Sequence, residues 1–537
     1  MIWFIQDFDL LSVLLRALTL SMETLTVGGV LFLLFVATRQ VTDSAVRDVA
    51  ARITAWSALG LAVVQPLAAA ESTAMLMGTT ELAFHEVATA PFFIADCVIA
   101  GAALLLYFVL KFGGQRRELA GAPLIVAIVA GSVALSHAQA RLDHHWLLLA
   151  LTAAHHFGMA GWAGAMPSLL LTMRRSETAK AAHVLASRFS TMAIVSVTLL
   201  VVAGGAMTYF YVGSWSGMYG TSYGVMLLAK IYLLLLALTL GAANFFLVRQ
   251  TRSDAQPLLI RLRRFSEAEI AFGFMAILAG ASLTSQPPAI DMTRDQLTKQ
   301  EIAERMDWKW PSLKSPQFAE LQPRLELKAF LEKASFSGGS ENDAMDRAWS
   351  EYNHHWAGLI VFAAGIFALL ARLKRMAWAR NWPLLFIALA VFIVLRADPE
   401  AWPLGPRPFW ASFAEADVLE HRFFAVLITA FAIYEWAVQT GRVRAMKAAL
   451  VFPTMCAVGG AVLLTHSHAL GNVKDEMLAE MTHTPIALLG ATAGMSRWLE
   501  LRLSREDREW KVAKVASWFW PICLILVGIV LMDYRES

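Results

Sequence analysis

The amino-acid sequence predicts an all-α polytopic membrane protein with about fourteen transmembrane helices. Hydrophobic residues make up 57% of the 537 residues, charged residues only 16%, and the mean hydropathy is +0.54. This balance is far from that of soluble proteins. Apolar runs recur along the whole chain, and about 20 such residues suffice to cross a hydrocarbon core of about 30 Å. The runs are continuous rather than alternating, which favours helices over a β-barrel.

The predicted spans follow one another from the N-terminus onward. Asp7 and Asp9 precede the first span, and no basic residue occurs before Arg16. A removed signal peptide would begin with basic residues, so we expect the first helix to be retained. The fourteen spans are expected at residues 10–38, 53–74, 89–111, 119–137, 146–173, 189–211, 222–248, 267–286, 353–371, 382–396, 417–439, 446–466, 479–497 and 512–533.

Basic residues divide the loops into two sets. Loops after odd-numbered spans contain stretches such as "RRSETAK" and "RLKRMAWAR", whereas the intervening loops contain stretches such as "YVGSWSGMYGTSYG". The positive-inside rule makes the basic loops cytoplasmic, and an even number of spans then places both termini on the extracytoplasmic side. The polar segment 287–352 lies outside on this topology. It separates an eight-span domain, residues 1–286, from a six-span domain, residues 353–537, and we expect it to be a linker segment.

Several classes of function find no support in the sequence. Cys97, Cys456 and Cys523 lie in apolar runs without CxxC spacing, so they are predicted to be core residues rather than disulfide partners or thiolate ligands. No phosphate-binding loop of the GxxxxGK[ST] type occurs, which argues against ATP-driven pumping by this chain. No arrangement of Ser, His and Asp, or of paired carboxylates, supports a hydrolytic enzyme. A nucleic-acid partner is not expected.

Histidines form a layer in the predicted topology. All thirteen except His183 fall on the outer side or in the outer half of the membrane. Polar groups at membrane depth are costly and commonly mark a pathway or a cofactor, and neutral imidazole binds copper, zinc, iron and heme alike. For any single histidine the alternative is an interfacial anchor or a hydrogen-bonding partner. The sequence predicts metal or heme ligands among His85, His137, His155, His156, His354, His355, His421, His466, His468 and His483.

Two of these histidines follow a glutamate by four residues at the outer start of a span. Glu81 precedes His85, and Glu351 precedes His355. A carboxylate one helical turn away can orient an imidazole that binds a metal. The alternative is an ordinary interfacial pair of Glu and His, and the sequence does not decide between the two.

Other charged residues lie inside predicted spans. Asp96 falls in the third span and Lys230 in the seventh, while Arg16, Glu23 and Glu435 lie in the first and eleventh. Charged residues within a membrane usually face the interior of the bundle and pair with one another. Asp96 and Lys230 are therefore predicted either to form a structural pair or to act as a charge relay coupled to transport.

Three segments of the chain resemble a known family. They are "LLRALTLSMETLTVGGVLFLL", "SHAQARLDHHWLLLALTAAHHFGMAGWAGAMPSLLL" at 136–171 and "YGTSYGVMLLAKIYLLLLALTLGAANFFLVR" at 219–249. Over about residues 10–286 the chain resembles the copper resistance D (CopD) family. The resemblance implies a multi-pass protein of the bacterial inner (plasma) membrane that moves copper from the periplasm to the cytoplasm. It carries over to His137, His155, His156, Trp162, Tyr223, Gly224, Lys230 and Asn244.

Copper transport is the first of the functions that these residues suggest. Copper would meet imidazoles at the outer mouth and in the middle of the eight-span domain, and would pass inward while Asp96 and Lys230 tune the local charge. A periplasmic copper donor is an expected partner, beside the lipid bilayer. The six-span domain has its own histidines and goes beyond the core family domain, so simple copper import does not account for the whole chain.

The second hypothesis is a b-type cytochrome. Spans 9, 11, 12 and 13 each bring a histidine to similar depth, as two-histidine ligation of heme b in a four-helix bundle requires. In "VLEHRFF", Glu420 would support His421 and Arg422 would bind a heme propionate, and an electron-transfer partner would then be expected. A membrane scaffold subunit without metal is the third hypothesis.

Overall fold

The computed structural model divides the chain into two compact units, and each is described by itself. Unit 1 comprises Met1–Gln296 with Leu464–Leu470, and unit 2 comprises Leu297–Leu463 with Gly471–Ser537. Helices account for all the regular secondary structure of the described residues. The structure describes residues 8–38, 42–80, 82–114, 116–176, 178–250, 256–293, 296–316, 342–398, 401–413, 416–465, 474–503 and 510–535.

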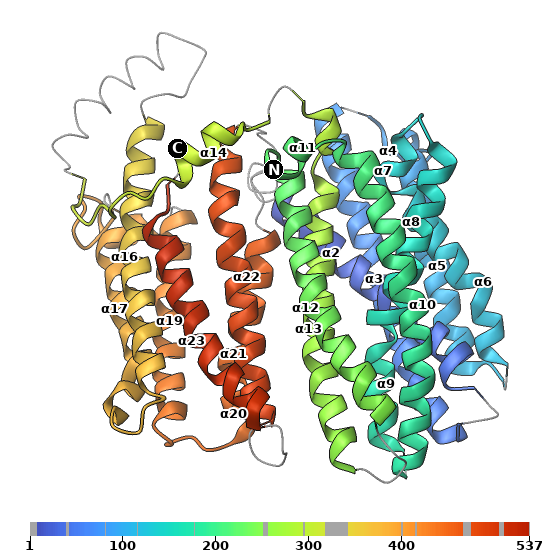
Figure 1. Cartoon of the computed structure of the whole chain (residues 1–537). Helices are drawn as coiled ribbons and strands as arrows, with labels where there is room; N and C mark the ends of the chain where they lie inside the picture. Colours follow the sequence, from blue (N-terminus) through green and yellow to red (C-terminus); the bar gives the residue numbers. More distant parts are fainter. Residues whose placement is uncertain are drawn as a thin grey trace. The chain divides into compact units, whose positions relative to one another are not determined.

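Unit 1 is a bundle of long helices joined by short ones (Figure 1). Its elements are α2 (Phe8–Leu31), η1 (Phe32–Val36), α3 (Ser44–Thr80), α4 (Phe84–Val87), α5 (Pro91–Phe112), α6 (Arg117–Ala134), α7 (His137–Ala140), α8 (His145–Met159), η2 (Ala160–Gly164), α9 (Met166–Arg175), α10 (Ala179–Val212), α11 (Trp215–Tyr219), α12 (Ser222–Gln250), α13 (Gln256–Ser285) and η3 (Ala289–Asp291). The short helices α4, α7 and α11 lie at one end of this unit, which we call the α7 end (Figure 1).

Unit 2 is also helical throughout its described residues. Its elements are α14 (Lys299–Met306), α16 (Asn342–Leu370), η4 (Ala377–Leu384), α17 (Leu385–Phe392), η5 (Ile393–Ala397), α18 (Phe409–Ser412), α19 (Ala416–Gln439), α20 (Met446–Ala449), α21 (Val451–Thr465), α22 (Lys474–Leu503) and α23 (Trp510–Met532). Its core is aromatic: the rings of Trp382, Phe452 and Trp520 contact one another and are almost completely buried.

The predicted fold class is confirmed. Every predicted span coincides with helical structure, and among the described residues twelve helices are long and apolar enough to cross a membrane. The two remaining predicted spans correspond to α8 with η2 and α9, and to α22, which lie outside those twelve. The number of fourteen spans, the position of both termini and the functional division into three segments stay predictions.

A π-helical turn, η2, brings two helices of unit 1 into backbone contact. α2 packs against η2, and a Cβ atom at Gly28 or Gly164 would overlap Ala160 O or Thr24 O, respectively. π-Helical turns inside α-helices are frequent at functional sites. Because only glycine permits this approach, α2 can lie directly beside the middle of the α8–η2–α9 segment.

We expect Gly164→Ala to destabilise unit 1. The added methyl group would have to displace the backbone of Thr24, and such overpacking costs about 1–3 kcal/mol. Thermal unfolding of the purified protein in detergent should therefore begin at a lower temperature. Gly205→Ala is the matched control, because nothing lies within 4 Å of a Cβ built there. Equal unfolding temperatures for the two variants would contradict the predicted close contact.

Candidate functional site

The middle of unit 1 holds a buried pair formed by His156 and Glu23. Glu23 on α2 is only 4% exposed. Its Oε1 lies 2.8 Å from His156 Nδ1 on α8, and its Oε2 accepts a hydrogen bond of 2.6 Å from Ser132 Oγ on α6. When His156 Nδ1–H donates to the carboxylate, the Nε2 atom of the neutral ring keeps its lone pair. A carboxylate that orients an imidazole in this way is typical of histidines that bind metals.

Two further groups surround this carboxylate. Arg16, about two turns before Glu23 on α2, interacts electrostatically with both Glu23 and Asp96. Asp96 is buried and accepts a hydrogen bond of 2.6 Å from Gln65 Nε2. A cation shared by two carboxylates lowers the cost of burying their charges.

The neighbouring imidazole, His155, has a cationic partner. Lys230 Nζ on α12 lies 3.4 Å from His155 Nε2. Gly204 gives room to the ring, since a Cβ atom there would lie 3.3 Å from two ring atoms of His155. Among the described residues, Asp96 interacts with Gln65 and Arg16 while Lys230 lies beside His155, and no ion pair joins Asp96 to Lys230. Each residue has a partner, but it is not the one predicted from the sequence.

Nearer the α7 end, His137 lies among polar and aromatic side chains. Its ring centroid is 6.4 Å from that of Tyr211, and its Nε2 makes no hydrogen bond to a described residue. Arg141 Nη2 is 2.6 Å from Asp291 Oδ2. His137 lies outside the candidate spans, and its burial, followed by the charge of Arg141, lowers its pKa below the usual value. The imidazole therefore stays neutral, and able to bind a metal, at a lower pH than an exposed histidine.

A second buried carboxylate, Glu269 on α13, contacts Trp162 of η2. Because Trp162 follows His155 by seven residues, this contact lies about 10 Å from His155 along the α8–η2–α9 segment. Trp162 Nε1 donates to Glu269 Oε1 at 2.8 Å, and Asn244 Nδ2 donates to Glu269 Oε2 at 2.6 Å. The family resemblance pointed to Trp162 and Asn244, and the structure joins them through this shared partner.

Tyr223 and Gly224 belong to the start of α12. Tyr223 is buried, and a Cβ atom at Gly224 would overlap the backbone of Gly217 and Met218. The Gly224 N–H donates to Thr221 Oγ1 at 3.0 Å. Gly224 fixes the start of α12 against α11, while the Tyr223 hydroxyl interacts electrostatically with Tyr211 and Arg141 beside His137.

Sequence reasoning missed the partners of the central histidines. Glu23 stood out as a charge inside a span but was not assigned to the site, and Gln65, Ser132 and Glu269 were not singled out. A usable signal for Glu269 was its position in "SEAEIAFGF", at the edge of an apolar run. No pattern in one sequence reveals that Glu23 faces His156, because this depends on how α2 and α8 are rotated against each other.

One of the predicted outer histidines, His85, is not buried. His85 lies on α4 and is exposed, and the carboxylate nearest to it in sequence, Glu86, accepts from the backbone N–H of Ala83 at 2.9 Å. Glu81 lies outside the described residues. His85 therefore has no described oriented carboxylate of the kind that holds His156.

Unit 2 brings two of its predicted histidines together. The His354 ring stacks on Tyr534 with 3.8 Å between centroids, and the His483 ring lies 6.1 Å from His354 and 5.6 Å from Tyr534. His354 Nδ1 lies 2.8 Å from Ser350 O, which leaves Nε2 as the atom with a lone pair. These three rings come from α16, α22 and the chain just after α23.

His355 is held by the backbone. Its Nδ1 accepts a hydrogen bond of 2.9 Å from Ser312 N, and its Nε2 lies 3.0 Å from Tyr534 O. Because both ring nitrogens are engaged, neither is open to a metal in this arrangement. Glu351, one turn before it, is half-buried.

His421 interacts electrostatically with His354 and has a carboxylate partner of its own. Its Nδ1 is 2.7 Å from Asp398 Oδ1, and the same carboxylate lies 3.9 Å from Arg422 Nη2. Arg422 donates to the carbonyl oxygens of Val394 and Trp402, and Glu420 is exposed. The predicted ligands His466 and His468 lie outside the described residues.

The described residues do not favour the heme hypothesis. Tyr534 fills the space beside His354 and His483. The large cavity of unit 2 is lined by Arg422 but by no histidine. No group of three or more His, Cys, Asp or Glu side chains suited to a metal ion occurs in the part of the chain that the structure describes.

Comparisons with known proteins relate the chain to copper resistance and transport. The family described as "Copper resistance protein D" (CopD) matches residues 182–283, a segment that contains Lys230, Asn244 and Glu269. "Copper transport protein CutJ" of Bacillus subtilis (strain 168) is 30% identical over 129 residues, which are 24% of this chain and 23% of that protein. No solved structure matches. The predicted resemblance to CopD is confirmed for residues 182–283, and this chain, with its long apolar helices, is a membrane protein similar to proteins of copper resistance and transport.

We expect Arg141→Gln to raise the pKa of His137. Arg141 is the second cause, after burial, that lowers this pKa, and its removal also frees Asp291, whose charge raises it. A histidine whose pKa is lowered by folding binds fewer protons than in the unfolded chain, so its contribution to stability is lost as the pH falls below about 6.5. In the variant, the free energy of unfolding should therefore fall less as the pH is lowered.

Histidine-selective NMR titration of the protein in nanodiscs measures the pKa directly. Arg174→Gln is the control, because Arg174 pairs with Glu267 and not with His137. A titration of His137 in Arg141→Gln at the same pH as in the parent protein, or at a lower one, would show that Arg141 does not act on this ring.

Proposed function

We propose that unit 1 moves copper across the bacterial inner membrane from the periplasm to the cytoplasm. The observation that carries the proposal is the pair of adjacent imidazoles in the middle of unit 1, each held by a charged side chain from another helix. Glu23 orients His156 and Lys230 lies beside His155. The match to CopD and the likeness to a protein named for copper transport support copper as the ion.

The charges around the two imidazoles suit an ion that has to leave again. Imidazole is a good ligand for copper, and the Glu23 carboxylate increases the basicity of His156. The Lys230 ammonium beside His155 repels a cation at short range. Attraction from one side and repulsion from the other keep binding weak enough for release, which transport requires. His137, nearer the α7 end, is the proposed entry ligand.

A role for unit 2 in metal binding or electron transfer is the second candidate function. It rests on His354 and His483, whose rings approach within 6.1 Å from different helices. A copper ion bound between His354 and His483 would lie close to two imidazoles and to the phenol ring of Tyr534. An absorption spectrum and a metal analysis of the purified chain distinguish copper from heme at this place.

Substitution of the central histidines should stop copper uptake. We expect His155→Ala and His156→Ala each to reduce the initial rate of uptake into proteoliposomes to background, because each removes an imidazole from the path. Glu23→Gln keeps a hydrogen-bonding side chain but loses the charge, and losses of about tenfold are typical for such supporting residues. Uptake is measured with radioactive or dye-reported copper.

His183→Ala is the matched control. His183 lies near the start of α10 and is not part of the buried pairs. It should transport at the parent rate. Undiminished uptake by the His155→Ala, His156→Ala double variant would refute the proposed path, whereas a loss in the His183→Ala control would indicate a general folding defect.

A further inference from the structure

We infer that Glu269 is a proton-binding site inside unit 1, and that it exchanges its proton as the transported cation passes. The coupling rests on the proposed function of unit 1, whereas proton binding does not. Glu269 is 4% exposed, and its partners are the neutral donors Trp162 Nε1 and Asn244 Nδ2. A buried carboxylate without a cationic partner is costly, and the neutral acid removes that cost.

The geometry of Asn244 favours the acid form. The contact between Asn244 and Glu269 Oε2 is 2.6 Å, which is shorter than the usual N–H···O range of about 2.7–3.2 Å and within the O–H···O range of about 2.5–3.0 Å. The amide oxygen and nitrogen of asparagine are interchangeable in shape. Asn244 Oδ1 is buried without a hydrogen-bond partner, and Asn244 is 8% exposed. An ionised carboxylate offers this oxygen no proton, whereas a protonated Glu269 donates to it after the amide turns over.

Charged groups on the surrounding elements are engaged elsewhere. Asn244 of α12 and Trp162 of η2 both contact Glu269, and neither side chain is charged. Lys230, on α12, lies fourteen residues before Asn244, about 21 Å away along the helix. The titratable groups of the packed helices have their own contacts: Glu23 with His156, Lys230 with His155, Arg174 and Arg264 with Glu267, Arg263 with Met173 O, and Arg188 with Phe35 O.

Proton and cation can replace each other at this residue. A cation that reaches the Glu269 level stabilises the ionised carboxylate, so the O–H bond breaks and the proton leaves to water on one side of the membrane. After the cation has moved on, the carboxylate takes up a proton from water on the opposite side of the membrane, so each cycle transfers one proton. One positive charge is present at Glu269 in both states, which keeps a bare carboxylate out of the membrane interior.

Infrared spectroscopy tests the proton site without copper. The parent protein should show the carbonyl stretch of a buried carboxylic acid, shifted by exchange into deuterated water, and Glu269→Gln should lack this band. Glu267→Gln is the matched control two residues away, because Glu267 pairs with the cations Arg174 and Arg264, a kind of partner that Glu269 lacks among the described residues. Absence of the band from the parent protein, or its persistence in Glu269→Gln, would overturn the proton site.

Proton flux in copper-loaded proteoliposomes tests the coupling. The parent protein should show a pH change inside the vesicles when copper is added, and Glu269→Gln should show none. An infrared band together with copper uptake but no pH change would overturn the coupling alone. A band without any copper uptake would overturn the function proposed for unit 1 and leave the proton site standing.

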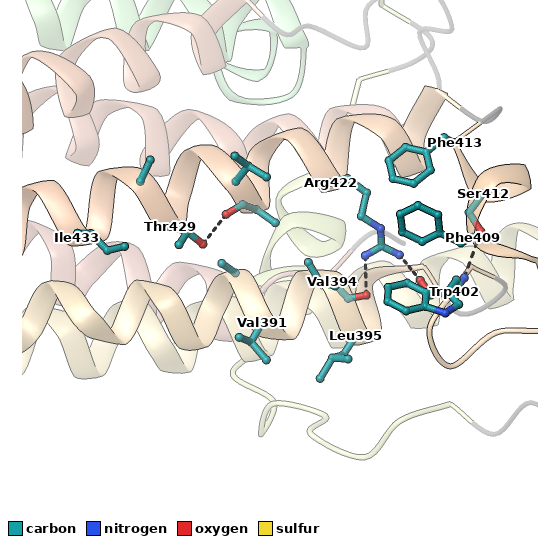
Figure 2. A pocket seen from close by; sticks show the side chains of 14 residues that line it. Val391, Val394, Leu395, Trp402, Phe409, Ser412, Phe413, Arg422, Thr429 and Ile433 are labelled. Carbon is teal, nitrogen blue, oxygen red and sulfur yellow. Dashed lines mark hydrogen bonds between the residues drawn. The ribbon is translucent and has the colours of Figure 1, made fainter.

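A groove in unit 2 carries a second, independent inference. It has a volume of about 740 Å³ and is lined by residues of α17, η5, the segment 401–413 and α19 (Figure 2). The side chains of Ala390, Ala425 and Ala430 are small and keep the groove open. Trp402, Phe409 and Phe413 lie together at one end of the groove. Figure 2 shows Arg422 at this aromatic end, bonded to the carbonyl groups of Val394 and Trp402.

The length and charge of the groove fit one phospholipid chain. Ile433 follows Arg422 by eleven residues on α19, a distance of about 16 Å along the helix, and one leaflet of a hydrocarbon core is about 15 Å thick. Two of the five N–H groups of Arg422 are used by carbonyl groups, and Asp398 lies 3.9 Å away. The remaining N–H groups can bind a phosphate, for which a guanidinium is well suited.

We propose that the groove holds one acyl chain of a phospholipid, with the phosphate at Arg422. Trp402 beside it belongs to the residue type that gathers at the membrane interface. Native mass spectrometry of the detergent-purified chain should detect one retained phospholipid. Ala425→Leu fills the floor of the groove and should reduce the retained fraction about tenfold, while Leu427→Phe, on the same helix but outside the lining, should leave it unchanged.

Arg422→Gln should lose the lipid as well, but it also removes two bonds to carbonyl groups, so Ala425→Leu is the decisive variant. Equal retention by Ala425→Leu and the parent protein would overturn the proposal. Retention of an isoprenoid quinone in place of phospholipid, or of no lipid at all, would overturn it too.

Discussion

The pairing of Glu23 with His156 is the interaction on which the organisation of unit 1 depends. Hydrocarbon offers no partner to a charged or polar group, so each such group has to find one on another helix. Glu23 meets this requirement twice, through His156 on α8 and Ser132 on α6, and thereby ties α2, α6 and α8 together. Without it, two helices would face each other with an unsatisfied imidazole and hydroxyl in the membrane interior.

Backbone geometry makes that pairing possible. Gly28 and Gly164 allow α2 to touch η2, and larger residues would push the two apart. Glu23 lies one turn before Gly28 on α2, and His156 lies one turn before η2. The π-helical turn and the two glycines therefore set the separation at which carboxylate and imidazole meet. The close approach of the two helices therefore also positions the candidate site.

The sequence was sufficient to predict the helical segments but not the contacts between them. Depth in the membrane can be predicted from one sequence, because apolar runs and basic loops give the ends of each helix. The direction in which a side chain points around the helix axis depends on packing. His155 and His156 were therefore predicted as site residues, whereas Glu23 was not recognised as the partner of one of them. Lys230 was predicted with Asp96 and lies instead beside His155.

The same distinction explains why a layer of histidines does not amount to one site. Histidines at similar depth share a cavity only if their helices are adjacent and turned toward each other. His354 and His483 meet this condition, His421 is held by Asp398, and His355 is held by the backbone. In unit 1 the polar interior changes its chemistry along the α8–η2–α9 segment, from imidazole nitrogen at His155 to carboxylate oxygen at Glu269. Imidazole nitrogen is a good ligand for copper and a buried carboxylate is a proton acceptor, so on the function proposed for unit 1 the first level binds the passing cation and the second exchanges a proton with it.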